Sequence, residues 1–226
     1  MAHLKRSCMP VFWPLPRKKK RFAFAPIPGP HPKKNCIPLA IIVRDIFKLC
    51  DTGREAKKII KNKNFLIDGR EIIEEKFPIG LMDILTIKKT NENYMVIPSK
   101  KGFEFKKIDN AKIKYLKIVG KRILKKGIQL NLHDGRNTLL PIDEKDKYKV
   151  CDTLKFNLVT KKIEEVISYK EGSDVIIIRG RNRGRRGKIK EIMIKKDLQG
   201  QKVKVTIDNE DKLFSRDFIF VIPEKF

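Results

Sequence analysis

A run of β-branched residues that breaks into glycines and arginines most limits what this chain can form. Residues 175–189 read Val-Ile-Ile-Ile-Arg-Gly-Arg-Asn-Arg-Gly-Arg-Arg-Gly-Lys-Ile. The apolar half is typical of a buried strand, the glycines permit positive φ angles, and guanidinium groups suit phosphate oxygens. The segment predicts a strand and hairpin that contacts phosphate, and a merely solvated turn is the alternative. The basic residues expected to make the contacts are Arg179, Arg181, Arg183, Arg185, Arg186 and Lys188.

The net charge favours a polyanion as partner. The chain holds 53 Lys+Arg against 27 Asp+Glu in 226 residues, a net charge of +26, which is typical of nucleic-acid-binding proteins. A membrane surface would attract the same charge, but the sequence lacks a lysine-rich amphipathic helix with an aromatic face. It also lacks an apolar stretch long enough for a bilayer span or a secretory signal. We expect a cytoplasmic protein with no membrane partner and no small-molecule substrate.

The cysteines favour reduced thiols over a metal site, because no two of them have Cys-x-x-Cys spacing. They are Cys8, Cys36, Cys50 and Cys151. His3 and Cys8 share the spacing of His31 and Cys36, so a Cys2His2 cluster stays an alternative, although the intervals match no common zinc finger. We expect no metal and no cofactor.

Residues 1–36 predict a basic RNA-binding tail. They hold seven of the 12 prolines and no acidic residue, which predicts disorder without a partner. Its cations would neutralise phosphates, and Trp13 would stack on a base or fill a hydrophobic notch. A solubilising tail or a nuclear-type basic signal is the alternative. The residues expected to contact RNA here are Lys5, Arg6, Trp13, Arg17, Lys18, Lys19, Lys20, Arg21, His31, Lys33 and Lys34.

Two helices and a small sheet are predicted next. Apolar spacing over 38–50 predicts an amphipathic helix, and the capping-box pattern from Thr52 to Glu55 starts a second helix that runs to about Asn62. Strands are expected from Phe65 into an Asp-Gly turn and over 77–87. The second helix carries a face of cations, which we expect to contact RNA; a solvated face is the alternative. The expected contacts in this region are Arg44, Arg54, Lys57, Lys58 and Lys61.

The rest of the chain before the arginine-rich turn predicts short strands. They are expected at 94–97, 115–119, 128–132, 138–141 and 153–158, spacing that fits a small barrel or sandwich. The hairpin of residues 129–137 places His133 and Arg136 beside its turn, and we expect both to contact RNA. A lone histidine in a turn favours hydrogen bonding over catalysis. We therefore expect no catalytic residue.

The order of the motifs resembles one ribosomal family. Residues 175–189 look like a KOW motif, and the cationic helix with "N-F-L-I-D-G" and "G-L-M-D-I-L" looks like the S-four RNA-binding domain. With "F-W-P", "P-G-P-H" and "L-N-L-H-D-G-R-N", the similarity to small-subunit ribosomal protein S-four-e covers nearly the whole chain, and the length looks archaeal. The resemblance implies a ribosome-bound, cytoplasmic protein that performs no chemistry. Its implied partners are small-subunit rRNA and neighbouring ribosomal proteins.

The predictions combine into an α+β, mostly β fold with four parts. These are a basic tail (1–36), an S-four-like helical RNA-binding module (37–98), a central small β-barrel-like module (99–170) and a C-terminal SH3-like KOW barrel (171–226). Two other functions stay open. S-four-type modules also occur on pseudouridine synthases, whose separate catalytic domain we do not find here. A KOW-type transcription factor that binds polymerase is the other alternative.

Overall fold

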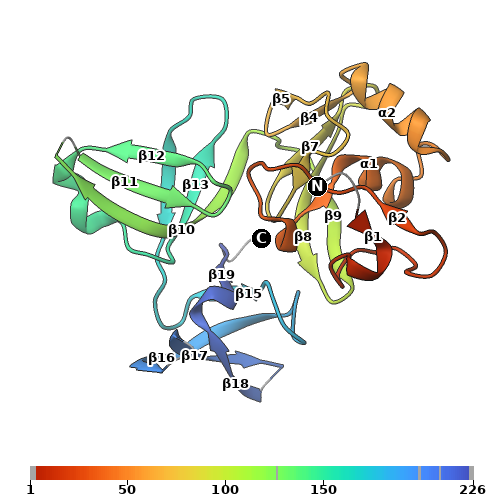
Figure 1. Cartoon of the computed structure of the whole chain (residues 1–226). Helices are drawn as coiled ribbons and strands as arrows, with labels where there is room; N and C mark the ends of the chain where they lie inside the picture. The colour runs from red at the N-terminus through yellow and green to blue at the C-terminus, as the bar shows by residue number, and fades with distance from the viewer. Residues whose placement is uncertain (1–3, 126, 198–199, 209, 224–226) are drawn as a thin grey trace. The chain divides into compact units, whose positions relative to one another are not determined.

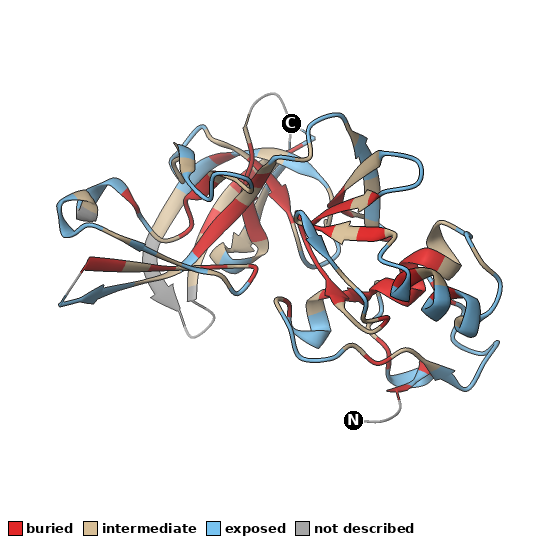
Figure 2. Ribbon diagram, turned by 90° about the horizontal axis from the view of Figure 1, so that it is seen from above, coloured by how far each residue is buried: buried red, intermediate tan, exposed pale blue. Residues whose placement is uncertain are grey.

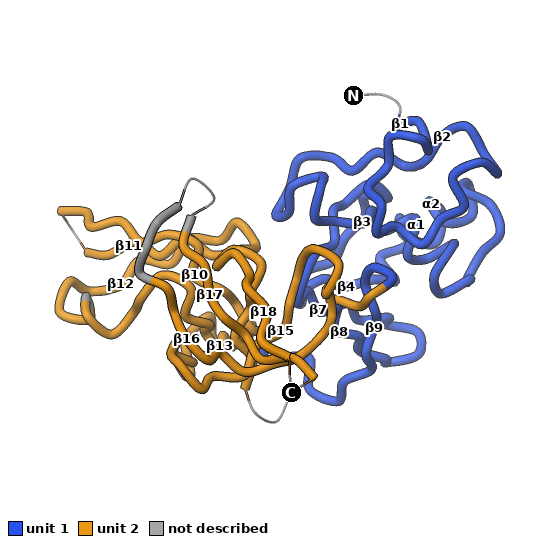
Figure 3. The backbone as a smooth tube through the Cα atoms, turned by 90° about the horizontal axis from the view of Figure 1, so that it is seen from below, with its two compact units in different colours: residues 1–97, 101–114 blue, residues 98–100, 115–226 orange. Residues whose placement is uncertain are grey.

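The protein is built mainly from strands. A computed structural model gives the structure of residues 4–125, 127–197, 200–208 and 210–223. Within these residues there are three five-stranded sheets, two two-stranded sheets and few helices (Figure 1). The expectation of a mostly β fold is therefore confirmed. The chain divides into two compact units, residues 1–97 with 101–114 and residues 98–100 with 115–226 (Figure 3). The four-part division stays a prediction.

The first unit holds one five-stranded sheet, whose order is β5-β4-β7-β8-β9. The Asp-Gly turn is confirmed, because Asp68 and Gly69 have φ angles of 50° and 77° between β4 and β5. Two positive φ angles in a two-residue turn are typical of a twisted hairpin. The strands are β4 (Phe65–Ile67), β5 (Arg70–Glu71), β7 (Ile84–Ile87), β8 (Glu92–Ser99) and β9 (Gly102–Ile108).

Two helical segments pack on this unit. Helix α1 (Leu39–Ile41) continues as a π-helical turn (Ile42–Ile46), so the first predicted helix ends earlier than expected. Helix α2 (Gly53–Lys61) confirms the second prediction, capping box included. The Glu55 N–H donates to Thr52 Oγ1 at 3.2 Å, and the Glu55 carboxylate accepts from the Thr52 N–H at 3.3 Å. Ala56 and Ile60 are buried on the apolar face of α2, which leaves its cations on the opposite face.

The tail is folded, which corrects the expectation of disorder. Strand β1 (Leu4–Lys5) pairs with β2 (Phe22–Ala23) in an antiparallel sheet. Trp13 is only 3% exposed, and its indole Nε1 donates to the Cys36 carbonyl at 2.8 Å. With Leu4, Met9 and Leu15 it belongs to the same core as α1 and β4. The apolar residues of the tail therefore bury enough surface to order it. A second short pair joins β3 (Ile37–Pro38) to β6 (Pro78–Ile79).

A buried ion network also holds the tail. Lys114 Nζ lies 2.6 Å from both Asp68 Oδ2 and Asp83 Oδ1, and His31 Nε2 lies 2.9 Å from Asp83 Oδ2. Burial alone would raise the pKa of Asp83, but Lys114 and His31 hold it far below its usual range. A Cβ on Gly80 would overlap the His31 ring, so glycine at this position lets the tail approach the Asp83 turn.

The second unit contains two five-stranded sheets, each on its own core (Figure 2). The strand orders are β12-β11-β10-β13-β14 and β18-β17-β16-β15-β19. Neither sheet closes on itself within the described strands, so the two predicted barrels are not confirmed. The first sheet comprises β10 (Ile113–Leu124), β11 (Gly127–Leu132), β12 (Asn137–Leu140), β13 (Thr153–Asn157) and β14 (Ile163–Ile167). The second comprises β15 (Asp174–Ile177), β16 (Arg186–Asp197), β17 (Gly200–Ile207), β18 (Glu210–Ser215) and β19 (Ile219–Val221).

Candidate nucleic-acid interface

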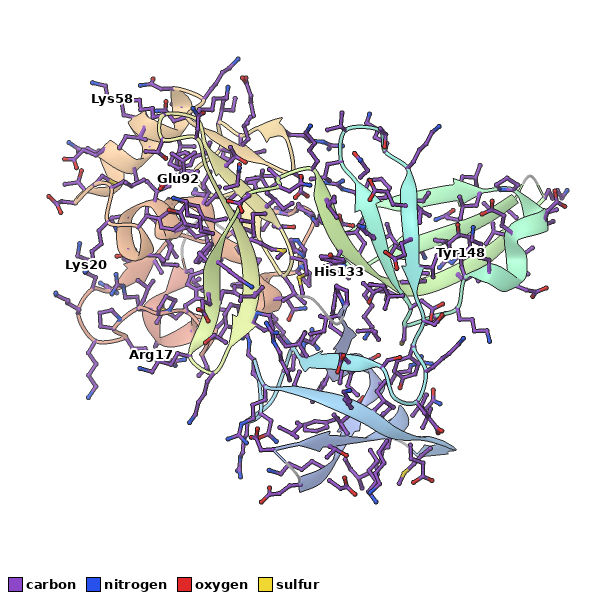
Figure 4. The ribbon with its side chains drawn as sticks, turned by 180° about the vertical axis from the view of Figure 1, so that it is seen from behind. Arg17, Lys20, Lys58, Glu92, His133 and Tyr148 are labelled. Atoms are coloured by element: carbon purple, nitrogen blue, oxygen red, sulfur yellow. The ribbon has the colours of Figure 1, made fainter. Side chains whose placement is uncertain are left out.

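Most of the cations predicted to contact RNA have exposed side chains. They come from the tail, from α2 and from the turn between β15 and β16 with the start of β16. Figure 4 shows Arg17, Lys20 and Lys58 at the outer margin of the first unit. The exposed members are Lys5, Arg17, Lys18, Lys19, Lys20, Arg21, Lys33, Lys34, Arg54, Lys57, Lys58, Lys61, Arg179, Arg181, Arg185, Arg186 and Lys188.

The face of α2 is cationic, as the periodicity predicts. Arg54, Lys57, Lys58 and Lys61 are all exposed. Lys57 pairs with Glu75 at 3.2 Å; within the described residues the other three make no ion pair. Burial would raise the pKa of Glu75, but a backbone hydrogen bond and Lys57 hold it below its usual value. The free charge of this face therefore lies on its other three cations.

The turn between β15 and β16 folds around two glycines. Gly180 and Gly184 have φ angles of 87° and 81°, a region that favours glycine. Arg185 lies 3.1 Å from Asp208. Arg183 is half-buried, and burial with the nearby Arg179 lowers its pKa to about 10. The turn thus presents its other arginines to solvent and holds Arg183 against the protein.

Substitution of Gly184 should destabilise the protein more than substitution of Gly180. A Cβ on Gly184 would lie 2.7 Å from the Ser99 Cα, whereas a Cβ on Gly180 would meet nothing within 4 Å. Gly180→Ala should lower the free energy of unfolding by about 1 kcal/mol through its positive φ alone. Gly184→Ala adds the backbone clash and should lower it by about 3 kcal/mol. Equal losses in urea denaturation would show that the approach to Ser99 does not matter.

Three predicted contact residues are buried, which corrects their assignment. Arg6, Trp13 and His31 are 3%, 3% and 5% exposed. Arg6 bonds backbone carbonyls, Trp13 fills the core instead of stacking on a base, and His31 contacts Asp83. Their side chains are occupied in holding the tail. They are not presented to a polyanion.

Three further predicted residues are half-buried. The guanidinium of Arg44 pairs with Asp45 at 2.7 Å and lies 5.4 Å from the centre of the Phe24 ring. His133 Nδ1 accepts a hydrogen bond from the Lys117 N–H at 3.1 Å, which confirms a hydrogen-bonding role for this turn histidine. Arg136 lies 3.0 Å from Asp134.

The burial of two lysines was not predicted from the sequence. Lys114 and Lys117 lie in β10 and are buried. The Lys117 ammonium donates to the carbonyls of Arg216 and Ile219 at 3.1 and 2.6 Å, and burial lowers its pKa. Lysine in a strand usually marks the solvent face, so no local signal distinguishes these two from the exposed cations.

The alternative metal cluster gains no support. His3 lies outside the described residues, and those that the structure describes contain no group of three or more His, Cys, Asp or Glu side chains that could hold a metal ion. Burial raises the pKa of Cys36 to about 12, which disfavours the thiolate that metal binding needs. In the described part of the chain, no helix has the length and apolar character needed to cross a membrane.

Comparisons with known proteins agree in family. The chain matches "Ribosomal family S4e" over residues 90–163, the RS4NT domain over 2–34 and the KOW motif over 171–208. Proteins named small ribosomal subunit protein eS4 are similar to it. The one from Methanocaldococcus jannaschii is 39% identical over 99% of this chain and 94% of that protein. The one from Staphylothermus marinus is 42% identical over 98% and 91%. The crystal structure of the 30S ribosomal protein S4e from Thermoplasma acidophilum superposes with a TM-score of 0.72 and 30% identity, covering 85% of this chain and 97% of that one.

Proposed function

The chain belongs to the ribosomal S4e family, and on that premise we propose that it is a structural constituent of the small ribosomal subunit that binds and stabilises folded rRNA. The proposal that the protein contacts rRNA rests on one observation, the set of exposed cations on the tail, on α2 and on the arginine-rich turn. Guanidinium and ammonium groups at such positions match phosphate oxygens. Neighbouring ribosomal proteins are the further partners, and the ribosome in the cytoplasm is its place of action.

Binding is multivalent in this proposal. Each cationic group holds a different stretch of rRNA backbone, and each contact raises the effective concentration of the next. Recognition follows the shape and phosphates of A-form RNA, because the deep major groove hides the base edges. The four predicted parts, 1–36, 37–98, 99–170 and 171–226, are the elements that reach separate RNA segments. The protein supports translation as a scaffold and performs no reaction.

The α2 face provides a test. We expect Lys58→Gln combined with Lys61→Gln to weaken binding to small-subunit rRNA by at least about tenfold and to lower the salt dependence. Both side chains are exposed, so the free energy of unfolding should change by less than about 0.5 kcal/mol per site. The measurement is filter binding at several salt concentrations.

A matched control comes from lysines that are already paired. Lys63 and Lys88 lie 3.1 and 2.5 Å from the Glu71 carboxylate. The pair Lys63→Gln and Lys88→Gln removes two charges from the same unit, and should change rRNA affinity far less than the α2 pair. Equal effects of the two double variants would remove the α2 face from the interface.

A further inference from the structure

The basic segment of the tail is closed into a loop by Arg6. The Arg6 N–H donates to the Arg21 carbonyl at 3.0 Å. Its guanidinium, which is buried, donates to the carbonyls of Pro16 at 2.8 Å and Phe22 at 3.3 Å. One side chain thus bonds the chain both before and after the run of cations at 17–21. A planar guanidinium can hold two carbonyls at once, whereas an ammonium lacks this fork.

Arg17 makes a second set of bonds that close the loop. Its guanidinium donates to the carbonyls of Ser7 at 3.2 Å and Met9 at 3.3 Å. Leu15, just before the basic run, and Ala25, just after it, are buried in the core of the first unit. Both ends of the run are therefore anchored to the folded protein.

The loop concentrates positive charge in a segment that contains no acidic residue. Its residues line an open hollow of about 370 Å³. In the part of the chain that the structure describes, Lys18, Lys19 and Lys20 form no ion pair. Like charges held close together repel each other, and a bound anion relieves that repulsion. The lining residues are Lys5, Arg6, Ser7, Arg17, Lys18, Lys19, Lys20 and Arg21.

We propose that residues 5–21 form a preformed site for successive phosphates of an RNA backbone, with Arg6 and Arg17 as positioning residues and Lys18, Lys19, Lys20 and Arg21 as the contacting cations. The inference rests on the proposed function, that the protein binds rRNA. A flexible basic tail would bind through charge alone. A closed loop presents the same charges at fixed positions and loses less conformational entropy on binding.

A charge-conserving substitution separates these two cases. Arg6→Lys keeps the charge and removes the fork, so we expect the full-length protein to bind small-subunit rRNA about tenfold more weakly with an unchanged salt slope. Arg70→Lys is the matched control. That side chain is exposed, lies in the same unit and is not among the predicted RNA contacts, so the affinity of this variant should stay within about twofold of the wild type. Hydrogen exchange should show loss of protection across 6–22 in Arg6→Lys only.

A second variant leaves the anchors intact. The triple variant Lys18→Gln, Lys19→Gln and Lys20→Gln keeps both arginine clamps and should fold as the wild type does. We expect the log–log salt slope to fall by about two to three, since each phosphate contact contributes roughly 0.7 to 0.9. Inorganic phosphate alone should bind only weakly, because a single anion engages a fraction of the cations.

Three results would overturn the inference. Wild-type affinity in Arg6→Lys would show that loop closure is irrelevant, and wild-type affinity in the triple variant would show that the loop is not a site. Tight saturation by inorganic phosphate would assign the hollow to a small anion instead of RNA. If the wild type itself fails to bind rRNA, the proposed function falls together with the inference. Wild-type binding with an unaffected Arg6→Lys variant overturns the inference alone.

Discussion

Replacement of Lys114 by methionine should lower the free energy of unfolding by about 3 to 5 kcal/mol. The Lys114 side chain is fully buried and lies 2.6 Å from each of two carboxylates, those of Asp68 and Asp83. Methionine fills a similar volume, so the loss comes from two buried carboxylates left without their cation. Urea denaturation followed by Trp13 fluorescence measures the effect, since Trp13 lies in the core of the same unit.

Two comparisons identify the cause. Lys112→Met removes an exposed cation two residues away and should change the stability by less than about 0.5 kcal/mol. Asp83→Asn added to Lys114→Met should restore part of the loss, because it removes one of the stranded charges. If Lys114→Met is no more destabilising than Lys112→Met, the buried network is not what holds this unit.

The network also sets the acid sensitivity of the first unit. Burial would raise the pKa of Asp83, but Lys114 and His31 hold it well below its usual range. A carboxylate with a depressed pKa contributes stability that is present above its unfolded pKa of about 4. That contribution is lost only as the pH falls through the lower folded pKa. The wild type should therefore keep it at mildly acid pH.

The second large effect is the salt dependence of rRNA binding. If at least about six phosphates are neutralised, affinity should fall roughly a thousandfold between about 50 and 200 mM salt. The exposed cations come from three separate groups in the chain, so six contacts is a modest expectation. Filter binding of the full-length protein to small-subunit rRNA across this range measures the slope.

The variants described above provide the internal control for this slope. Neutralising Lys18, Lys19 and Lys20 should flatten it, whereas Arg6→Lys should lower the affinity without flattening it. A slope near zero for the wild type would contradict phosphate contacts as the main source of affinity. It would also remove the basis for the proposed role of the α2 face.

Local patterns were sufficient wherever neighbours along the chain determine the structure. The capping box at Thr52 and the turn at Asp68 and Gly69 were predicted correctly, because each depends on a few adjacent residues. The cationic face of α2 followed from helical periodicity, since the apolar residues Ala56 and Ile60 fix which side is buried. The five strands expected over residues 94–158 overlap observed strands for the same reason.

Contacts between residues far apart in the chain could not be predicted from local sequence patterns. The proline content of the tail predicted disorder, but Trp13 bonds a carbonyl 23 residues away and its neighbours join the core without any helical or strand period. Lys114 donates a hydrogen bond to Asp68, which lies 46 residues earlier in the chain. No pattern in the sequence of β10 indicates that the Lys114 side chain is buried. Arg6, whose buried guanidinium bonds two carbonyls, was predicted as an RNA contact, because charge alone cannot distinguish a guanidinium facing carbonyls from one facing solvent.

Sedimentation through sucrose gradients is the most direct test of the central claim, that this protein is a constituent of the small ribosomal subunit held by rRNA. Cell extract is run at low and at moderate salt, and each fraction is probed for the chain. We predict comigration with the small subunit at low salt and partial release at moderate salt, because many phosphate contacts act together and salt weakens each of them. A position in the light fractions at both salt concentrations would contradict the account and favour a free RNA-modifying or transcription protein.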